Sequence, residues 1–229
     1  MIEYSIVIPV YNEEESLSLL FDEMKRAMDP LQKFYQIIFV NDCSSDRSPH
    51  ILKGFQEMAP DVVEVINLPQ RSGQTFAMKK GLEAAEGNIV VTLDADLQND
   101  PSDIPRLLEK MNEGYDVVCG WRKARQDKRL KAILSKIGNI LQRIITGMTI
   151  HDVSCTLRAY KKECVRKIPL NWKGQHRFIP LCLSLQGYRA GEIISHHRLR
   201  QFGHSKYSHK RIFRVMMDFF RILMAGGKK

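Results

Sequence analysis

The sequence predicts an α/β protein in which a mainly parallel sheet is flanked by helices. The chain has 229 residues, which is enough for one large domain with a substantial core. Short runs of apolar, β-branched residues alternate along it with segments whose apolar residues recur at helical spacing. Strands that alternate with helices form βαβ units, and such units build a parallel sheet.

Each expected element has its own signal in the sequence. Apolar, β-branched runs bounded by turn residues predict strands at residues 4–10, 35–40, 62–68, 89–93 and 115–120. Apolar residues spaced by three or four predict helices at residues 17–24, 48–58, 75–86, 128–148 and 210–224. Pro9 lies where the first strand should end, because proline cannot donate to the hydrogen-bond ladder of a central strand.

Polar clusters follow three of these strands at the point where each strand ends. They occupy residues 9–13, 41–46 and 94–98. Because the carboxyl ends of parallel strands meet at one edge of a sheet, we expect the three clusters to share a cleft. Glu13 and Asp42 can accept hydrogen bonds from a nucleobase N–H or from ribose hydroxyls. Ordinary turn chemistry is the alternative for each cluster taken alone.

Asp94 and Asp96 end the fourth strand, one residue apart. Side chains alternate along a strand, so these two carboxylates can share a direction. Two hard oxygen ligands that leave room for substrate phosphates suit Mg²⁺ or Mn²⁺. The pair therefore predicts a divalent metal site, with a solvated loop after a strand as the alternative reading.

The positive charge of the chain is concentrated in its second half. Residues 1–127 carry 13 Lys and Arg against 22 Asp and Glu, whereas residues 128–229 carry 22 against 4. This asymmetry indicates an anionic partner for the second half. Membrane lipid, a phosphorylated substrate and nucleic acid are the three candidates.

Cysteine usage and hydropathy indicate a reduced setting. The five cysteines are odd in number and show no Cys-x-x-Cys spacing, so we expect neither a disulfide framework nor a zinc site. No signal peptide precedes the first strand, and no apolar run approaches the roughly 20 residues that span a bilayer. We therefore expect a cytoplasmic protein that is peripheral at the inner or cytoplasmic face of a membrane.

Pro9–Glu13, Asn41–Asp46 and Asp94–Pro101 together resemble the signature of inverting family 2 glycosyltransferases with the GT-A fold. Within that family the chain is similar to the polyprenyl-phosphate hexosyltransferases, which use dolichyl or undecaprenyl phosphate. Asn41 stands where many relatives have aspartate, so the base contact is assigned to Asp42. The resemblance implies a nucleotide-sugar site at Pro9, Tyr11, Glu13, Asp42, Asp94, Ala95 and Asp96, a Mg²⁺ or Mn²⁺ site at Asp94, Asp96 and Gln98, and a catalytic role for Asp96.

Two basic segments of the second half resemble the acceptor side and a closing loop of these enzymes. The first segment is residues 151–160. There the resemblance implies that Ser154 and Arg158, together with Arg122 after the 115–120 strand, face the acceptor phosphate, and that both arginines are catalytic. Arginine suits this role because its guanidinium binds phosphate in a bidentate way. In residues 198–207, the resemblance implies that Arg200 and Lys206 neutralise the leaving diphosphate. The alternatives are a structural ion pair for Arg158 and a solvated basic loop for residues 198–207.

These segments divide the chain into a catalytic domain at residues 1–209 and an amphipathic juxtamembrane helix with a tail at 210–229. The catalytic domain would comprise a nucleotide-sugar-binding half at 1–120 and an acceptor-binding half at 121–209. The 128–148 helix carries basic residues outside an apolar stripe, so it can lie in a membrane interface or pack as a surface helix. Many relatives continue into two transmembrane helices here, and the sequence leaves open whether this chain is naturally short or truncated.

A missing base motif favours a lipid phosphate as the acceptor. A sugar hydroxyl needs a positioned general base, whereas a phosphate is already anionic, with a second pKa of about 6. The Gln-x-x-Arg-Trp and Glu-Asp motifs of processive polysaccharide synthases do not occur in this sequence. We therefore expect transfer of a hexose, with inversion, from a donor of the GDP-mannose or UDP-glucose type to a polyprenyl phosphate.

Two other functions stay open on the sequence. One is a soluble transferase that acts on a saccharide or protein hydroxyl. The other is a nucleic-acid-binding module without catalysis, which the basic charge permits but which we do not expect. The base, the sugar, the prenyl length and the oligomeric state, a homo-oligomer included, are not fixed by the sequence.

Overall fold

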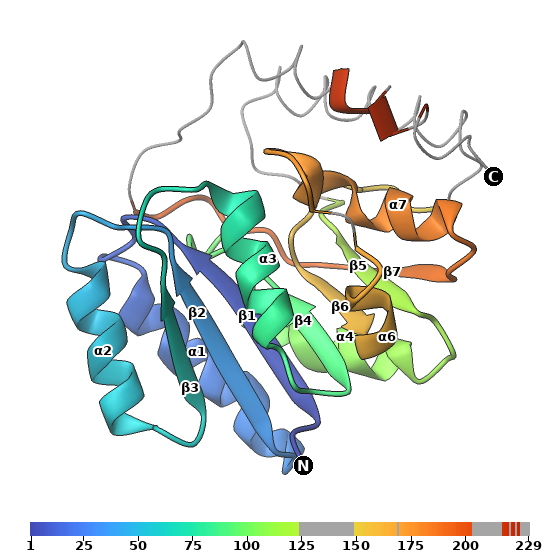
Figure 1. Ribbon diagram of the computed structural model, residues 1–229. Coiled ribbons are helices and arrows are strands. Elements are labelled where there is room, and N and C mark those ends of the chain that lie inside the picture. The colour runs from blue at the N-terminus through green and yellow to red at the C-terminus, as the bar shows by residue number, and fades with distance from the viewer. Residues whose placement is uncertain (124–148, 169, 203–216, 220, 223, 225–229) are drawn as a thin grey trace.

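A single mixed sheet forms the centre of the molecule, as the computed structural model shows (Figure 1). The structure describes residues 1–123, 149–168, 170–202, 217–219, 221, 222 and 224. Within them the strand order is β3-β2-β1-β4-β6-β5-β7. The strands are β1 (Tyr4–Val10), β2 (Tyr35–Asn41), β3 (Val63–Asn67), β4 (Ile89–Thr92), β5 (Val117–Trp121), β6 (Arg158–Lys161) and β7 (Ala190–Ile194).

The sheet is mainly parallel, which confirms the expected fold class. Strands β3, β2, β1 and β4 run parallel to one another, and β5 runs parallel to β7. Strand β6 is antiparallel to both of its neighbours, β4 and β5. Because β6 reverses direction between them, β4 and β5 end at the same edge of the sheet. This carboxyl edge carries the loops that follow β1, β2, β4 and β5.

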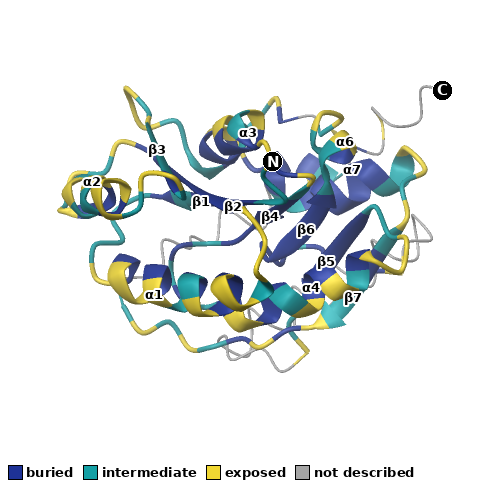
Figure 2. Ribbon diagram, turned by 90° about the horizontal axis from the view of Figure 1, so that it is seen from below, coloured by how far each residue is buried: buried dark blue, intermediate teal, exposed yellow. Residues whose placement is uncertain are grey.

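Helices cover both faces of the sheet (Figure 2). Helices α1 (Leu17–Met28), α2 (Ser48–Met58) and α4 (Ile104–Met111) bury their apolar side chains against one face. Helices α3 (Gln74–Ala84), α6 (Lys162–Val165) and α7 (Ile179–Leu185) cover the other. Short 3₁₀ turns occupy Asp29–Leu31, Pro101–Asp103 and Gln175–Phe178. Every residue of β2 is buried, as expected for a strand covered on both faces.

The predicted strands at residues 4–10, 35–40, 62–68, 89–93 and 115–120 are confirmed to within a few residues. Pro9 lies inside β1, but beyond Val7, the last residue of β1 that pairs with β4. Its missing N–H therefore leaves no gap in the hydrogen-bond ladder between β1 and β4. Strands β6 and β7 and helices α4, α6 and α7 were not predicted from the sequence.

Only part of the predicted C-terminal helix falls within the described residues. Phe219 and Ile222 pack against Phe178 and Leu181, beside α7. Among the described residues, no helix has the length and apolarity that crossing a membrane requires. The predicted 128–148 helix and all of residues 203–216 lie outside the described part. The domain boundaries at residues 120 and 209 stay predictions.

Candidate active site

Hydrogen bonds from short polar side chains hold the loops after β1 and β2 together. The N–H of Asn12 donates to Ser44 Oγ at 3.0 Å, and the N–H of Ser45 donates to Asn12 Oδ1 at 2.8 Å. The N–H of Glu13 donates to Ser48 Oγ at 3.0 Å. Two of the three predicted polar clusters therefore form one continuous rim at the carboxyl edge.

All three clusters contain a residue with an unusual backbone conformation. Asn12, Cys43 and Leu97 have φ angles of 52°, 57° and 59°. A positive φ is uncommon outside glycine and is costly for a bulky residue such as leucine. Strained residues of this kind persist where the surrounding structure holds them, often at functional sites. Leu97 is buried, so its packing helps to fix the turn that directly follows Asp96.

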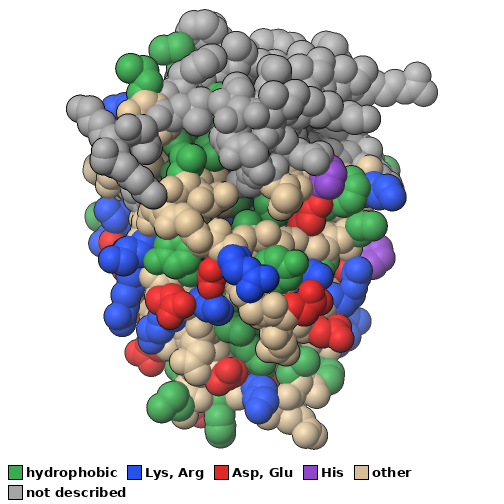
Figure 3. All heavy atoms as spheres, turned by 90° about the vertical axis from the view of Figure 1, so that its right-hand side faces the viewer, with side chains coloured by type: hydrophobic (Ala, Val, Ile, Leu, Met, Phe, Trp, Pro, Cys, Tyr) green, Lys and Arg blue, Asp and Glu red, His purple; other side chains and the backbone are tan. Residues whose placement is uncertain are grey.

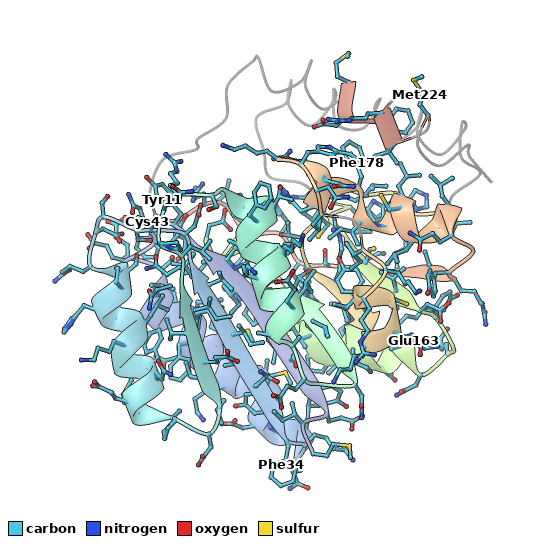
Figure 4. All side chains as sticks on the ribbon, viewed as in Figure 1. Tyr11, Phe34, Cys43, Glu163, Phe178 and Met224 are labelled. Carbon is cyan, nitrogen blue, oxygen red and sulfur yellow. The ribbon has the colours of Figure 1, made fainter. Side chains whose placement is uncertain are left out.

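Labelled side chains in Figure 4 mark the two ends of the sheet. Tyr11 and Cys43 lie at the end where β1 and β2 finish, and Phe34 lies at the opposite end. A shallow groove of about 520 Å³ runs along residues 68–72 and α3, beside the first of these ends. A second hollow of about 630 Å³, lined in part by Phe34, lies at the opposite end, away from the predicted site.

Asp42 is engaged by the loop that precedes α3. Its two carboxylate oxygens accept hydrogen bonds from the N–H groups of Ser72, at 2.6 Å, and Gly73, at 2.8 Å. From the same loop, the guanidinium carbon of Arg71 lies 4.0 Å from the ring centroid of Tyr11. The loop thus contacts two of the four residues predicted to hold the nucleoside, and their role there stays a prediction.

Asp94 and Asp96 follow β4 at the carboxyl edge, with Ala95 buried between them. Gln74 Nε2 donates to Asp94 Oδ1 at 2.6 Å, and the N–H of Gln98 donates to Asp96 Oδ1 at 3.2 Å. Burial and the negative charge of Asp96 raise the pKa of Asp94 to about 6. The two carboxylates therefore repel each other at a site where a cation would relieve the repulsion.

This carboxylate pair fits a metal that is shared with a substrate. Among the described residues, no group of three or more His, Cys, Asp or Glu side chains could hold a metal ion. Two aspartates alone are too few for an all-protein Mg²⁺ or Mn²⁺ cage, but they suit an ion whose other ligands are water and substrate phosphate.

Arg200 approaches the acidic side of the site from the segment after β7. Its Nη2 donates to Glu13 Oε1 at 3.0 Å and lies 3.8 Å from Asp96 Oδ2. The segment is anchored by Arg198, which forms ion pairs with Glu23 of α1, at 2.8 Å, and Asp100, at 2.6 Å. The structure thus brings Arg200 to the predicted diphosphate site, whereas Lys206 lies outside the described residues.

Arg122 and Ser154, both predicted to face the acceptor phosphate, lie within hydrogen-bond distance of each other. Arg122 forms a bidentate ion pair with Asp152, with nitrogen–oxygen distances of 2.7 and 3.0 Å. Its Nη2 also donates to Ser154 Oγ at 2.9 Å. Asp152 is buried, so it holds the guanidinium in a fixed orientation next to the end of β5.

Arg158 is buried within the protein, with no exposed surface. Its guanidinium donates to the backbone carbonyls of Val153, at 2.7 Å, and His176, at 2.9 Å. The predicted alternative of an ion pair with a carboxylate is not what the structure shows among the described residues. In this conformation Arg158 acts on the site through its charge, which, like that of Arg122, opposes the rise in the pKa of Asp94. Its contact with an acceptor phosphate stays a prediction.

Sequence reasoning missed four residues that shape this site. Arg71 and Gln74 belong to the loop at residues 69–74, for which the sequence predicts no role. Asp152 and Thr156 lie within residues 151–160, the segment that resembles the acceptor side of the family. The glycine before Gln74, at φ 91°, marks the sharp start of a helix next to the site. In the sequence, that glycine is the only local sign that the loop has a structural role, because the contacts of Arg71 with Tyr11 and of Gln74 with Asp94 join residues far apart in the chain.

Solved structures with the same fold are available for comparison. Glucosyl-3-phosphoglycerate synthase from Mycobacterium tuberculosis is 19% identical, with a TM-score of 0.71 over 98% of this chain and 80% of that one. The mannosyltransferase PcManGT from Pyrobaculum calidifontis, in complex with GDP-Man and Mn²⁺, is 20% identical, with a TM-score of 0.72 over 99% and 65%. TarS 1–349 from S. aureus, in complex with UDP, is 16% identical, with a TM-score of 0.67 over 100% and 67%.

The mainly parallel sheet, with a carboxylate pair at its carboxyl edge, is the architecture of a glycosyltransferase with the GT-A fold. The family model "Glycosyl transferase family 2" matches residues 5–169, and the chain belongs to this family.

Proposed function

We propose that this glycosyltransferase moves a hexose from a nucleotide sugar to a polyprenyl phosphate at the surface of a membrane. One observation carries the proposal. Arg122, which Asp152 holds at the end of β5 and which also donates to Ser154, offers a fixed cation, and its charge opposes the rise in the pKa of Asp94. An acceptor phosphate is already an anion, and it needs fixed cations and orientation more than it needs a general base.

On the donor side, the rim formed by the loops after β1 and β2 would hold the nucleoside through Pro9, Tyr11, Glu13 and Asp42. Asp94, Asp96 and Gln98 would hold Mg²⁺ or Mn²⁺, which neutralises the diphosphate when bound. Solved relatives in complex with Mn²⁺ and UDP, or with GDP-Man and Mn²⁺, support a donor of this kind.

The chain's own residues would then orient the acceptor and receive the leaving charge. Arg122, held by Asp152, would fix the acceptor phosphate together with Ser154. The phosphate oxygen would attack the anomeric carbon in line, so that the configuration inverts. Arg200 would leave Glu13 and Asp96 to pair with the diphosphate, together with Lys206.

Transfer to a hydroxyl group is the second candidate. A solved relative contains phosphoglyceric acid together with UDP and Mn²⁺, which favours a small anionic acceptor of that kind. A saccharide or protein hydroxyl belongs to the same chemical class, since each needs a base to remove its proton.

A two-step experiment tests the proposal. Thermal stabilisation by GDP and UDP sugars, with and without Mn²⁺, identifies the donor. Transfer of labelled hexose is then compared between a polyprenyl phosphate, phosphoglyceric acid and free saccharides. Turnover that is highest with the polyprenyl phosphate supports the proposal, and preferred transfer to a hydroxyl acceptor overturns it.

A further inference from the structure

A side chain from outside the polar clusters holds the carboxylate of Asp94. Gln74, the first residue of α3, donates its side-chain amide N–H to Asp94 Oδ1 at 2.6 Å.

Gln74 ties Asp94 to a second acidic residue of the site. The N–H groups of Ser72 and Gly73 hold Asp42, and the next residue, Gln74, holds Asp94. Three consecutive residues thus fix the relative position of two carboxylates that follow different strands, β2 and β4.

We propose that Gln74 is a positioning residue, which fixes the carboxylate of Asp94 in the orientation that binds the donor's metal and diphosphate. The inference rests on the proposed function, because it assigns Gln74 to the metal-dependent donor site. Gln74 is a neutral donor, and this is what the role requires: a lysine at position 74 would cancel the negative charge of Asp94, and a glutamate would repel it. Partners that orient metal ligands in this way typically contribute 10- to 100-fold to metal affinity.

An isosteric substitution separates the hydrogen bond from the packing. Gln74→Met keeps roughly the side-chain volume and removes the donor. Gln70→Met is the matched control, since Gln70 is exposed in the same loop and its side chain makes no hydrogen bond within the described structure. Mn²⁺ affinity is measured by electron paramagnetic resonance with UDP and with GDP, and nucleotide affinity without metal is measured by calorimetry.

We expect Gln74→Met to lower Mn²⁺ affinity by about 10- to 100-fold, with metal-free nucleotide affinity unchanged. Gln70→Met should keep the wild-type value. If Gln74→Met binds Mn²⁺ as the wild type does, or loses metal-free nucleotide binding to the same degree, the positioning role is overturned while the proposed function stands. A wild-type protein that binds no Mn²⁺ with either nucleotide overturns the proposed function, and the positioning role with it.

Discussion

At the scale of single residues, Asp96 is where three parts of the site meet. It follows β4, receives the N–H of Gln98 and faces Arg200 from the segment after β7. The side chain is only 15% exposed, so the carboxylate is partly desolvated before any substrate arrives. A partly desolvated carboxylate gains more from a cation than one in free solution, because the local dielectric constant is lower.

Asp96→Asn should remove metal-enhanced donor binding and leave the fold intact. The substitution keeps the size of the side chain and removes the charge that a divalent ion needs, so we expect a loss of about 100-fold or more in kcat/KM. Initial rates and thermal melting curves, each with and without Mn²⁺, check this. Unchanged wild-type turnover in excess EDTA would show that the pair has no metal role.

Arg122→Ala should weaken transfer to the acceptor and leave donor affinity unchanged. A charge-assisted hydrogen bond contributes about 1.5–3 kcal/mol, so we expect kcat/KM for the lipid phosphate to fall by roughly 10- to 100-fold. The substitution also leaves the buried Asp152 carboxylate without this partner, so Asp152→Asn is measured in parallel. If Arg122 serves only to neutralise the charge of Asp152, the double variant that combines Arg122→Ala with Asp152→Asn should recover wild-type transfer.

At the scale of elements, the sequence predicts those strands that are runs of mainly apolar, β-branched residues. Strands β1, β2 and β4 are continuous apolar runs, and their order along the chain dictates that their polar ends meet. Strand β6, with Arg158 and Lys161 in a four-residue run, has no such signal, and it forms because β4 and β5 pair with its two edges. The contacts of Arg71 and Gln74 depend on the same long-range packing, so local pattern could not reveal them.

Packing between α3 and the sheet should make Gly81→Ala destabilising. A β-carbon at Gly81 would lie 2.3 Å from Val7 Cγ1 and 3.0 Å from Val40 Cγ2, in the core. Such overpacking costs about 1–3 kcal/mol, against the gain of up to about 1 kcal/mol that alanine brings to a helix. Gly54→Ala in α2 is the matched control, since nothing lies within 4 Å of its added carbon.

Urea denaturation should therefore show a lower free energy of unfolding for Gly81→Ala and a higher one for Gly54→Ala. Equal stabilisation by the two substitutions would mean that the α3–sheet contact is looser than the structure shows.

Asp116 should make the contact between β5, β6 and β7 sensitive to acid. Despite partial desolvation, the pKa of Asp116 is lowered by its hydrogen bonds from Lys161 and from the N–H of Arg189, both at 2.8 Å. A carboxyl whose folded-state pKa lies below its unfolded value stabilises the fold above the unfolded pKa of about 4, and this contribution is lost as the pH falls through the folded value.

Asp116→Asn should therefore lower the free energy of unfolding at pH 7, and the difference from wild type should shrink below about pH 4. Urea denaturation at a series of pH values measures it. A difference that stays constant down to pH 2 would assign the effect to lost packing.

At the scale of the whole molecule, the excess positive charge lies outside the described residues. The described part carries 23 Lys and Arg against 25 Asp and Glu, while the chain as a whole has a net charge of +9. On the face shown in Figure 3, basic and acidic side chains lie interspersed over the described surface. Any strong attraction to an anionic membrane must therefore come from residues 124–148, 203–216 and 225–229, which contain the remaining basic residues.

The described part of the C-terminal helix has one face on the core and one exposed face. Phe219 and Ile222 pack toward α7. Met217 and Met224, seven residues apart and thus on one side of a helix, are 56% and 80% exposed, and the exposed Arg221 lies between them. An exposed face that combines apolar and basic side chains suits the interface of a bilayer.

Membrane binding should accordingly depend on the basic residues of the 128–148 segment. An anionic leaflet attracts each nearby Lys or Arg by about 1 kcal/mol, so replacing Lys128, Arg129 and Lys131 by Gln should weaken binding by about 3 kcal/mol, or roughly 100-fold. Lys79→Gln with Lys80→Gln, on α3, is the control, because these residues belong to the charge-balanced described part. Sedimentation with vesicles should show binding to anionic lipid, little to neutral lipid, and release at high salt, where exposed charges are screened. Equal sedimentation with both lipid types, or equal losses in the triple variant and the control, would contradict an electrostatic attachment through this segment.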